Sequence, residues 1–184
     1  MISISKSIRA LKWPLFSFVA APLLLMLFVP FMGSCWHWRY GDFVYYGQWK
    51  IRVAPSFYVR KDAAGLSLWK LSFGYSVWHG ADALIGIREL RRPFQYEDDY
   101  PRFLKGADMA AENQGYKFLS AKEIRFGTGT SHCLEYGALK DVTKSFVQCA
   151  VEDTSLTFSY GGHTKYIPVL FSTIQSIQHI DSDR

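Results

Sequence analysis

The feature that most constrains this chain is an uncharged stretch from Trp13 to Trp36, in which residues 15–32 are almost wholly apolar. At 1.5 Å per helical residue, roughly 20 residues cross the hydrocarbon core of a bilayer, and this stretch is slightly longer. Its prolines do not exclude a transmembrane helix, because proline is tolerated there and produces local kinks. We therefore expect a membrane-spanning signal anchor over residues 13–35.

The charges beside this stretch predict its orientation. Lys6, Arg9 and Lys12 precede it, whereas only Arg39 follows it closely. The positive-inside rule then keeps residues 1–12 in the cytoplasm as a short tail and exports residues 36–184. We expect a single-pass protein of the cell membrane with an extracytoplasmic C-terminal domain, which is periplasmic if the cell is Gram-negative.

A second interpretation of the same segment is a bacterial lipoprotein. Residues 32–35 read Met-Gly-Ser-Cys, which resembles a lipobox with Met in place of the usual Leu. Cleavage before Cys35 would make that cysteine a lipidated N-terminus. Ordinary signal-peptide cleavage after Ser34 is disfavoured, because Met32 would occupy a position where a small residue is required. Signal anchor and lipoprotein both stay open, and both tether the soluble part to the outer side of a membrane.

Length and composition indicate one ordinary domain beside this segment. The chain has 184 residues, of which 49% are hydrophobic and 20% charged, so long disorder and a disulfide-dense mini-protein are excluded. The formal net charge of +5 includes the three basic residues of the tail, and without them it is +2. Such a mixed surface is typical of a soluble domain, so we expect no nucleic-acid partner.

Two cysteines beyond the membrane segment predict a disulfide. Cys133 and Cys149 lie in runs with strand character, at 131–136 and 145–151. If these runs pair antiparallel around a turn at 138–144, residues whose numbers sum to 282 face each other, which places Cys133 opposite Cys149. An exported protein meets an oxidising compartment, where such a pair forms a disulfide. Two unbonded buried thiols are the alternative.

The remaining pattern predicts an α+β fold. Runs of aromatic and β-branched residues between glycines and prolines indicate strands, listed here by number: 43–46, 49–53, 57–60, 66–73, 83–87, 116–126 and 155–160, besides the two cysteine runs. Apolar residues at helical spacing indicate one helix over 101–114 and another after Pro168. Gly161-Gly162 is expected to form a tight turn. We expect a mainly antiparallel sheet packed against helices.

The order of these elements resembles a known family. An aromatic opening that ends in a proline-containing turn is followed by a helix, by strands that begin at Tyr116-Lys117-Phe118, and by a closing helix over residues 171–177. This order is similar to the PsbP/Mog1-like α/β/α sandwich and covers residues 40–180. The resemblance implies a small binding or accessory domain, and it carries over no functional residue.

Motifs of catalysis are absent from the sequence. It contains no P-loop, no His-Glu-x-x-His, no Gly-x-Ser-x-Gly and no Cys-x-x-Cys, so we expect neither catalytic residues nor a cofactor. An enzyme of another mechanism would need a polar pocket with perturbed ionisable groups. The sharper alternative is a metal-binding or thiol-dependent envelope protein. His132, Cys133, Cys149 and His163 would suit zinc or copper if their strands are neighbours.

Two groups of residues form a candidate binding surface. Tyr75 and Trp78 lie in an aromatic turn, which could bind a glycan, a peptide or the bilayer surface. Ordinary filling of the core is the more common role for such residues. Arg88, Arg91 and Arg92 form the densest basic cluster. Because the acidic residues 97–99 follow, this region is more typical of a solvated loop than of an anion site. The leading interpretation is a non-enzymatic, membrane-tethered extracytoplasmic domain that binds an envelope protein or glycan.

Overall fold

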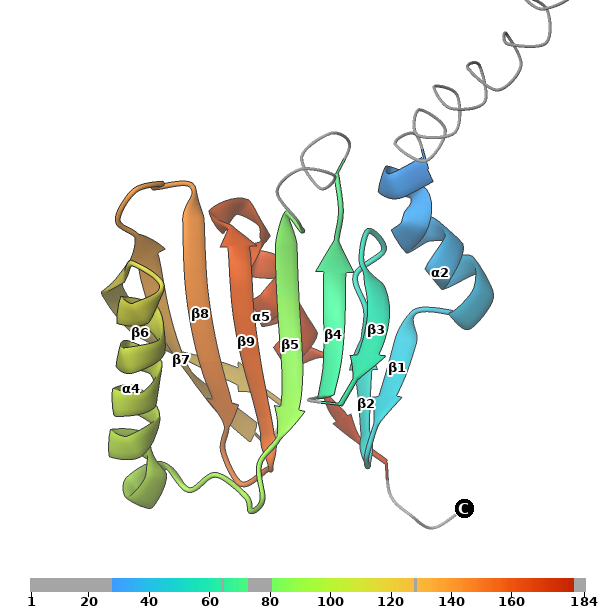
Figure 1. The fold of residues 1–184 in the computed structure, drawn as a ribbon. Coiled ribbons are helices and arrows are strands. Elements are labelled where there is room, and N and C mark those ends of the chain that lie inside the picture. The colour runs from blue at the N-terminus through green and yellow to red at the C-terminus, as the bar shows by residue number, and fades with distance from the viewer. Residues whose placement is uncertain (1–27, 64, 73–80, 128, 181–184) are drawn as a thin grey trace, which may run out of the picture.

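A computed structural model describes residues 28–63, 65–72, 81–127 and 129–180 (Figure 1). Seven strands form one antiparallel sheet in the order β3-β4-β5-β9-β8-β7-β6, and β1-β2-β10 form a second one. The strands are β1 (Phe43–Tyr46), β2 (Trp49–Arg52), β3 (Tyr58–Asp62), β4 (Gly65–Lys70), β5 (Ala83–Glu89), β6 (Tyr116–Phe126), β7 (Gly129–Ala138), β8 (Lys144–Val151), β9 (Leu156–His163) and β10 (Gln178–His179). The helices are α2 (Met32–Tyr40), α4 (Tyr96–Asn113) and α5 (Ile167–Gln175), with 3-10 turns at Val29–Phe31 and Thr164–Tyr166. This architecture confirms the predicted α+β class.

One face of the seven-stranded sheet, the closed face, carries the main core. Alternate residues of the strands point to opposite faces of a sheet, and the large buried side chains of β4, β5, β8 and β9 share one of them. They pack in a single cluster with the second sheet and α5: Ile51, Leu66, Leu68, Ile85, Ile87, Val147, Phe158, Leu170 and Ile174 are all 1% exposed or less. Large apolar residues at these alternate positions are the reason that the two layers associate.

The opposite face is covered over only part of its width. Helix α4 packs there against β6, β7 and β8. A second core cluster joins Ala107 and Ala111 of α4 to Leu134, Tyr136 and Phe146 of the strands. Helices α4 and α5 therefore lie on opposite sides of the sheet, as both figures show.

No helix or strand of the described residues covers the rest of this second face, over β3, β4, β5 and β9 (Figure 1). We call this area the open face. Strand registers place ten residues on it: Tyr58 and Arg60 of β3, Ser67 and Trp69 of β4, Leu84, Gly86 and Arg88 of β5, and Thr157, Ser159 and Gly161 of β9. An antiparallel sheet tolerates such an uncovered face.

Helix α4 begins five residues before the predicted start at Pro101, which therefore lies inside the helix. The acidic run at 97–99, expected in an exposed loop, forms its first turn. There the carboxylates face the positive end of the helix dipole, and Asp99 accepts a hydrogen bond from the backbone N–H of Gln95, the N-cap residue, at 3.1 Å. The prediction missed this start because it followed the apolar residues at helical spacing, the first of which is Phe103.

Gly161-Gly162 does not form the predicted turn. Both glycines lie inside β9, which runs on to His163, and a 3-10 turn follows at Thr164–Tyr166. Gly162 has a φ of 147°, and a Cβ there would lie 2.3 Å from the backbone oxygen of Asp82. The glycine is thus needed for close approach of two backbones, which a sequence pattern does not distinguish from a turn. The short strand β10 and the helix α2 were also not predicted.

Most of the predicted membrane segment, residues 13–27, lies outside the described residues. None of the helices within the described residues combines the length and apolar character needed to cross a bilayer. Its last residues, Met32–Cys35, begin α2. This helix packs on the domain. Gly33 is buried against the backbone of Ser56, and the two ring nitrogens of His37 lie 2.9 Å from acceptor oxygens, the carboxylate of Asp42 and the backbone carbonyl of Ala54.

Candidate functional site

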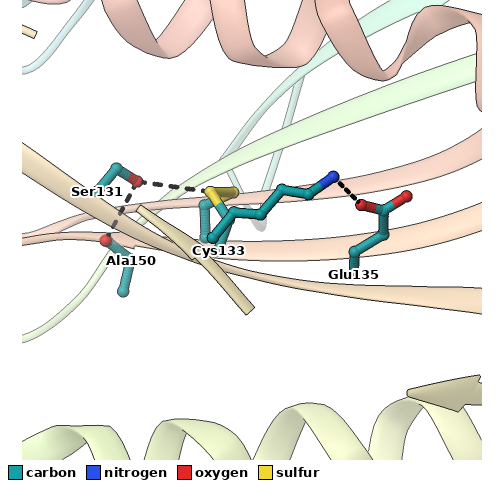
Figure 2. Close-up of a disulfide and its surroundings, with 6 residues drawn as sticks. Ser131, Cys133, Glu135 and Ala150 are labelled. Atoms are coloured by element: carbon teal, nitrogen blue, oxygen red, sulfur yellow. Dashed lines mark hydrogen bonds and ion pairs between the residues drawn. A yellow bond between two sulfur atoms is a disulfide. The ribbon is translucent and has the colours of Figure 1, made fainter. Parts of the chain in front are cut away.

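The predicted disulfide is present. Cys133 of β7 lies opposite Cys149 of β8 in the register whose numbers sum to 282, and the two sulfurs are bonded. Both residues are on the closed face and are 2% exposed or less. Figure 2 shows Ser131 and Glu135 on either side of Cys133; Ser131 donates to the Ala150 carbonyl at 3.2 Å. Such burial indicates a structural bond rather than a reactive one.

The four residues of the predicted alternative metal site, His132, Cys133, Cys149 and His163, do not come together. Both cysteine sulfurs are in the disulfide, and His132 points to the other face of β7. His163 pairs with Lys144 whereas His132 pairs with Ala150, so the histidines are six strand residues apart, or roughly 20 Å. Within the described part of the chain, no three His, Cys, Asp or Glu side chains are placed to hold a metal ion.

His132 instead belongs to a packed aromatic group beneath α4. Its ring stacks on Tyr96 with centroids 4.1 Å apart, and it is 7% exposed. Nε2 lies 3.2 Å from a carboxylate oxygen of Glu152, and Nδ1 lies 3.8 Å from one of Glu123. These contacts fix the start of α4 on the sheet, which positions one wall of the open face.

The centre of the open face is built from small residues. Successive strands place Ser67, Gly86 and Ser159 side by side in one row, with Arg60 at its end on β3. The neighbouring row contains Tyr58, Trp69, Leu84 and Gly161. All of them except the exposed Arg60 are half-buried. These small residues form the floor of a shallow depression, which lies between the rings of Tyr58 and Trp69 on one side and α4 on the other.

One end of the open face deepens into a cleft of about 390 Å³, the arginine cleft. Its floor is formed by β8 and β9, its wall by α4, and its end by the segment that joins β5 to α4. The residues that line it are Leu90, Arg91, Arg92, Phe94, Asp99, Arg102, Phe103, Ala150 and Thr157. Three guanidinium groups thus surround a partly apolar floor.

The other end of the open face adjoins a larger and more polar pocket, of about 650 Å³. Trp69, Leu84 and Gly161 of the open face contribute to it, together with Asp141 and His163. The His163 ring accepts a hydrogen bond from the backbone N–H of Lys165 at 3.3 Å. The indole nitrogen of Trp69 is buried and has no hydrogen-bond partner among the described residues.

The predicted binding residues are divided between described and undescribed parts of the chain. Tyr75 and Trp78 lie outside the described residues. Arg88 lies on the open face beside Thr157, and Arg91 and Arg92 line the arginine cleft. Arg91 and Arg92 are exposed in the segment that joins β5 to α4, and the guanidinium of Arg92 lies 2.5 Å from a carboxylate oxygen of Asp99. The hydrogen bond from Gln95 N–H, together with the charge of Arg92, holds the pKa of Asp99 below its ordinary value.

Sequence reasoning did not identify Tyr58, Arg60, Arg102 or Phe103 as members of this surface. Arg102 and Phe103 lie in the middle of α4, where a helical pattern shows amphipathicity but not which strands the helix leaves uncovered. One signal was available. Ser67, Gly86, Ser159 and Gly161 are small residues at alternate strand positions, where an exposed face usually carries long polar side chains.

No protein-family model matches this sequence, and comparison with curated proteins finds no match. The chain is similar in structure to cyanobacterial PsbP (CyanoP) from Synechocystis sp. PCC 6803, known from its solution structure, with 14% identity and a TM-score of 0.46. The match covers 72% of this chain and 86% of that one. A PsbP protein is thus what both the sequence pattern and the structure resemble. Similarity at this level transfers no ligand, partner or residue role.

Proposed function

We propose that this chain is a membrane-tethered, extracytoplasmic binding domain whose open face docks an envelope protein. The observation that carries the proposal is the construction of that face: a floor of small residues between the rings of Tyr58 and Trp69 and helix α4, with a pocket at each end. Tyrosine, tryptophan and arginine are the residue types that dominate binding energy in protein interfaces, and all three border this floor.

Two features support the extracytoplasmic location. The disulfide between Cys133 and Cys149 is of the kind that persists in oxidising compartments. The uncharged stretch from Trp13 to Trp36, preceded by Lys and Arg, is of the kind that anchors and orients a single-pass protein. A tether raises the effective concentration of the domain near membrane-bound partners, so modest affinity suffices for an accessory role.

The binding proposal is tested by photo-crosslinking in the membranes of the native host. A benzophenone amino acid replaces Ser159 on the open face or, as a control, Met109, which is 56% exposed on α4. We expect a discrete cross-linked protein from position 159 only, and its loss when Trp69→Ala is added. Equal labelling from both positions, or labelling that Trp69→Ala leaves unchanged, contradicts the proposal. The thermal midpoint of each variant checks its fold.

The tether is tested by the intact mass of protein extracted from membranes without reductant. A full-length chain with one reducible bond supports the signal anchor. A shortened, acylated chain moves the tether to Cys35. An unacylated chain released from the membrane by carbonate washing contradicts both forms of the tether, while leaving the binding experiment above to stand by itself.

A further inference from the structure

The arginine cleft is a rigid, preformed site. The segment that joins β5 to α4 is tied to the β8–β9 connection by backbone hydrogen bonds: Leu90 N–H to Ser155 at 2.6 Å, Phe94 N–H to Thr154 at 2.7 Å, and Asp153 N–H to Phe94 at 2.9 Å. Phe94 is 2% exposed and its ring packs edge-on against Phe103, with centroids 5.7 Å apart. The cleft therefore requires little ordering when a ligand binds, which favours affinity.

The arginine cleft carries an excess of positive charge. Arg91, Arg92 and Arg102 line the cleft, and Asp99 is the one acidic residue among the described residues that line it. Asp99 is already engaged by Arg92 and by the backbone of Gln95. Arg91 makes no hydrogen bond or ion pair with any described residue, and Arg102 acts on Asp99 through its charge alone. Two guanidinium groups thus remain available for an anion.

The chemistry of the lining specifies more than a charge. A guanidinium group donates two parallel hydrogen bonds to a carboxylate, which gives geometric specificity as well as attraction. Leu90, 39% exposed, and the half-buried ring of Phe103 supply an apolar surface next to these donors, and the buried ring of Phe94 supports it from below. A group that fits both parts carries a carboxylate and an apolar side chain within a few residues of each other.

The cleft continues along the open face rather than closing around a small molecule. Arg88 lies next to Thr157 of the cleft, and Arg60 lies two strands further and two residues along, roughly 12 Å away. Small-molecule sites bury most of their ligand, whereas a row of exposed arginines beside a flat floor suits an extended partner.

We propose that the arginine cleft binds an acidic segment of a protein partner, with its carboxylates on Arg91 and Arg102 and an apolar side chain against Leu90 and Phe103. This inference rests on the proposed function, because it assigns the chemistry of the partner that docks on the open face. Arg88 and Arg60 extend the complementary charge along the path that the same segment would follow.

The test uses the full chain in nanodiscs of neutral phosphatidylcholine and a fluorescent twelve-residue peptide of Glu, Leu and Phe. The matched peptide has Gln in place of every Glu. We expect saturable binding of the Glu peptide, roughly tenfold tighter than that of the Gln peptide and weakened by salt. The double variant Arg91→Ala/Arg102→Ala loses roughly tenfold in affinity, since two charge-assisted contacts are removed.

The matched control is Arg52→Ala/Arg125→Ala, which removes the same charge at two exposed arginines outside the cleft and leaves the affinity unchanged. Equal affinity for the Glu and Gln peptides, equal loss in both double variants, or no binding at millimolar peptide overturns the inference. All four arginines are exposed, so the variants are expected to fold, and their thermal midpoints verify this.

A second probe separates a peptide from a lipid. Vesicles of phosphatidylglycerol present anionic headgroups without a polypeptide. If they bind in a manner that depends on Arg91 and Arg102 while the Glu peptide does not compete, the cleft is a lipid site and the inference falls. If the peptide test fails but the cross-link from position 159 persists in Arg91→Ala/Arg102→Ala, the open face still docks a partner and only the inference about the arginine cleft is overturned.

Discussion

The two faces of the seven-stranded sheet differ most clearly along a single strand. On β5, Ala83, Ile85 and Ile87 point to the closed face and are fully buried, whereas Leu84 and Gly86 between them are half-buried on the open face. The closed face is thus filled with apolar volume that drives the packing of α5 and the second sheet. The open face has little such volume, so its residues are free to serve recognition rather than stability.

The largest test of this difference compares neighbours on β5. Ile85→Ala leaves a cavity in the main core and is expected to cost about 2–5 kcal/mol of unfolding free energy. Leu84→Ala on the open face is expected to cost about 1 kcal/mol or less, because its side chain is half-buried and solvent fills the space. Urea unfolding followed by tryptophan fluorescence measures both. Equal losses would mean that the open face is part of the core.

The second test removes the cross-link of the closed face. Cys133→Ala/Cys149→Ala is expected to cost about 3 kcal/mol, the stabilisation of a loop of this length by restriction of the unfolded chain. Cys35→Ser is the matched control, because this cysteine is exposed on α2 and unbonded. It should leave the unfolding midpoint unchanged. Two variants of similar stability would show that β7 and β8 need no covalent link.

The same contrast explains which parts of the structure the sequence could predict. The register of Cys133 and Cys149 follows from alternation and one turn, both local properties, and it was predicted correctly. Most strands were found for the same reason, since aromatic and β-branched residues mark them. The start of α4 was missed because it is marked by a hydrogen bond between Gln95 and Asp99, whereas the prediction followed the apolar spacing that begins at Phe103.

The open face was beyond prediction for a different reason. Alternation shows which residues of β5 share a side, but the area that α4 leaves uncovered depends on tertiary packing. Helix α4 sits over β6–β8 because the ring of His132 stacks on Tyr96, and because Tyr136 donates a hydrogen bond to Asp108 at 2.8 Å. No spacing in the sequence relates these residues, which are 28 to 36 positions apart.

A third test compares the covered and open parts of the second face. Burial, with the hydrogen bond to Asp108, raises the pKa of Tyr136 well above its ordinary value. A tyrosine whose pKa is raised in the folded state contributes stability that is fully present below the unfolded-state pKa of about 10. This stability is lost as the pH rises above about 10 toward the folded-state pKa. Tyr136→Phe removes the hydrogen bond, about 1–2 kcal/mol at neutral pH.

The control for this test is Tyr58→Phe. Burial raises the pKa of Tyr58 as well, but the charge of Arg60 opposes that shift. We therefore expect Tyr58→Phe to change stability less than Tyr136→Phe, both at neutral pH and in the alkaline range. Urea unfolding at pH 8 and pH 11 provides the comparison. A larger effect at Tyr58 would mean that the open face contributes more to stability than the end covered by α4.

The smallest expected effect lies at the boundary between the two parts, where Asp99 joins the arginine cleft to the first turn of α4. The pKa of Asp99 is lowered by the backbone of Gln95 and by Arg92, so its stabilisation is present above the ordinary carboxyl pKa and is lost as the pH falls through the folded-state value. Asp99→Asn should therefore lower the thermal midpoint slightly at neutral pH, and this difference should vanish in acid.

The matched variant is Asp98→Asn, in the same helical turn, because the side chain of Asp98 makes no hydrogen bond or ion pair with a described residue. Asp98→Asn loses mainly the interaction of its charge with the helix dipole, so it should lower the thermal midpoint less than Asp99→Asn does. Because Asp99 also neutralises Arg92, Asp99→Asn leaves one more uncompensated guanidinium in the cleft and should tighten the Glu peptide. A weaker complex would instead show that Asp99 matters mainly by holding Arg92 in place, which would turn the cleft from a charge-selective site into a shape-selective one.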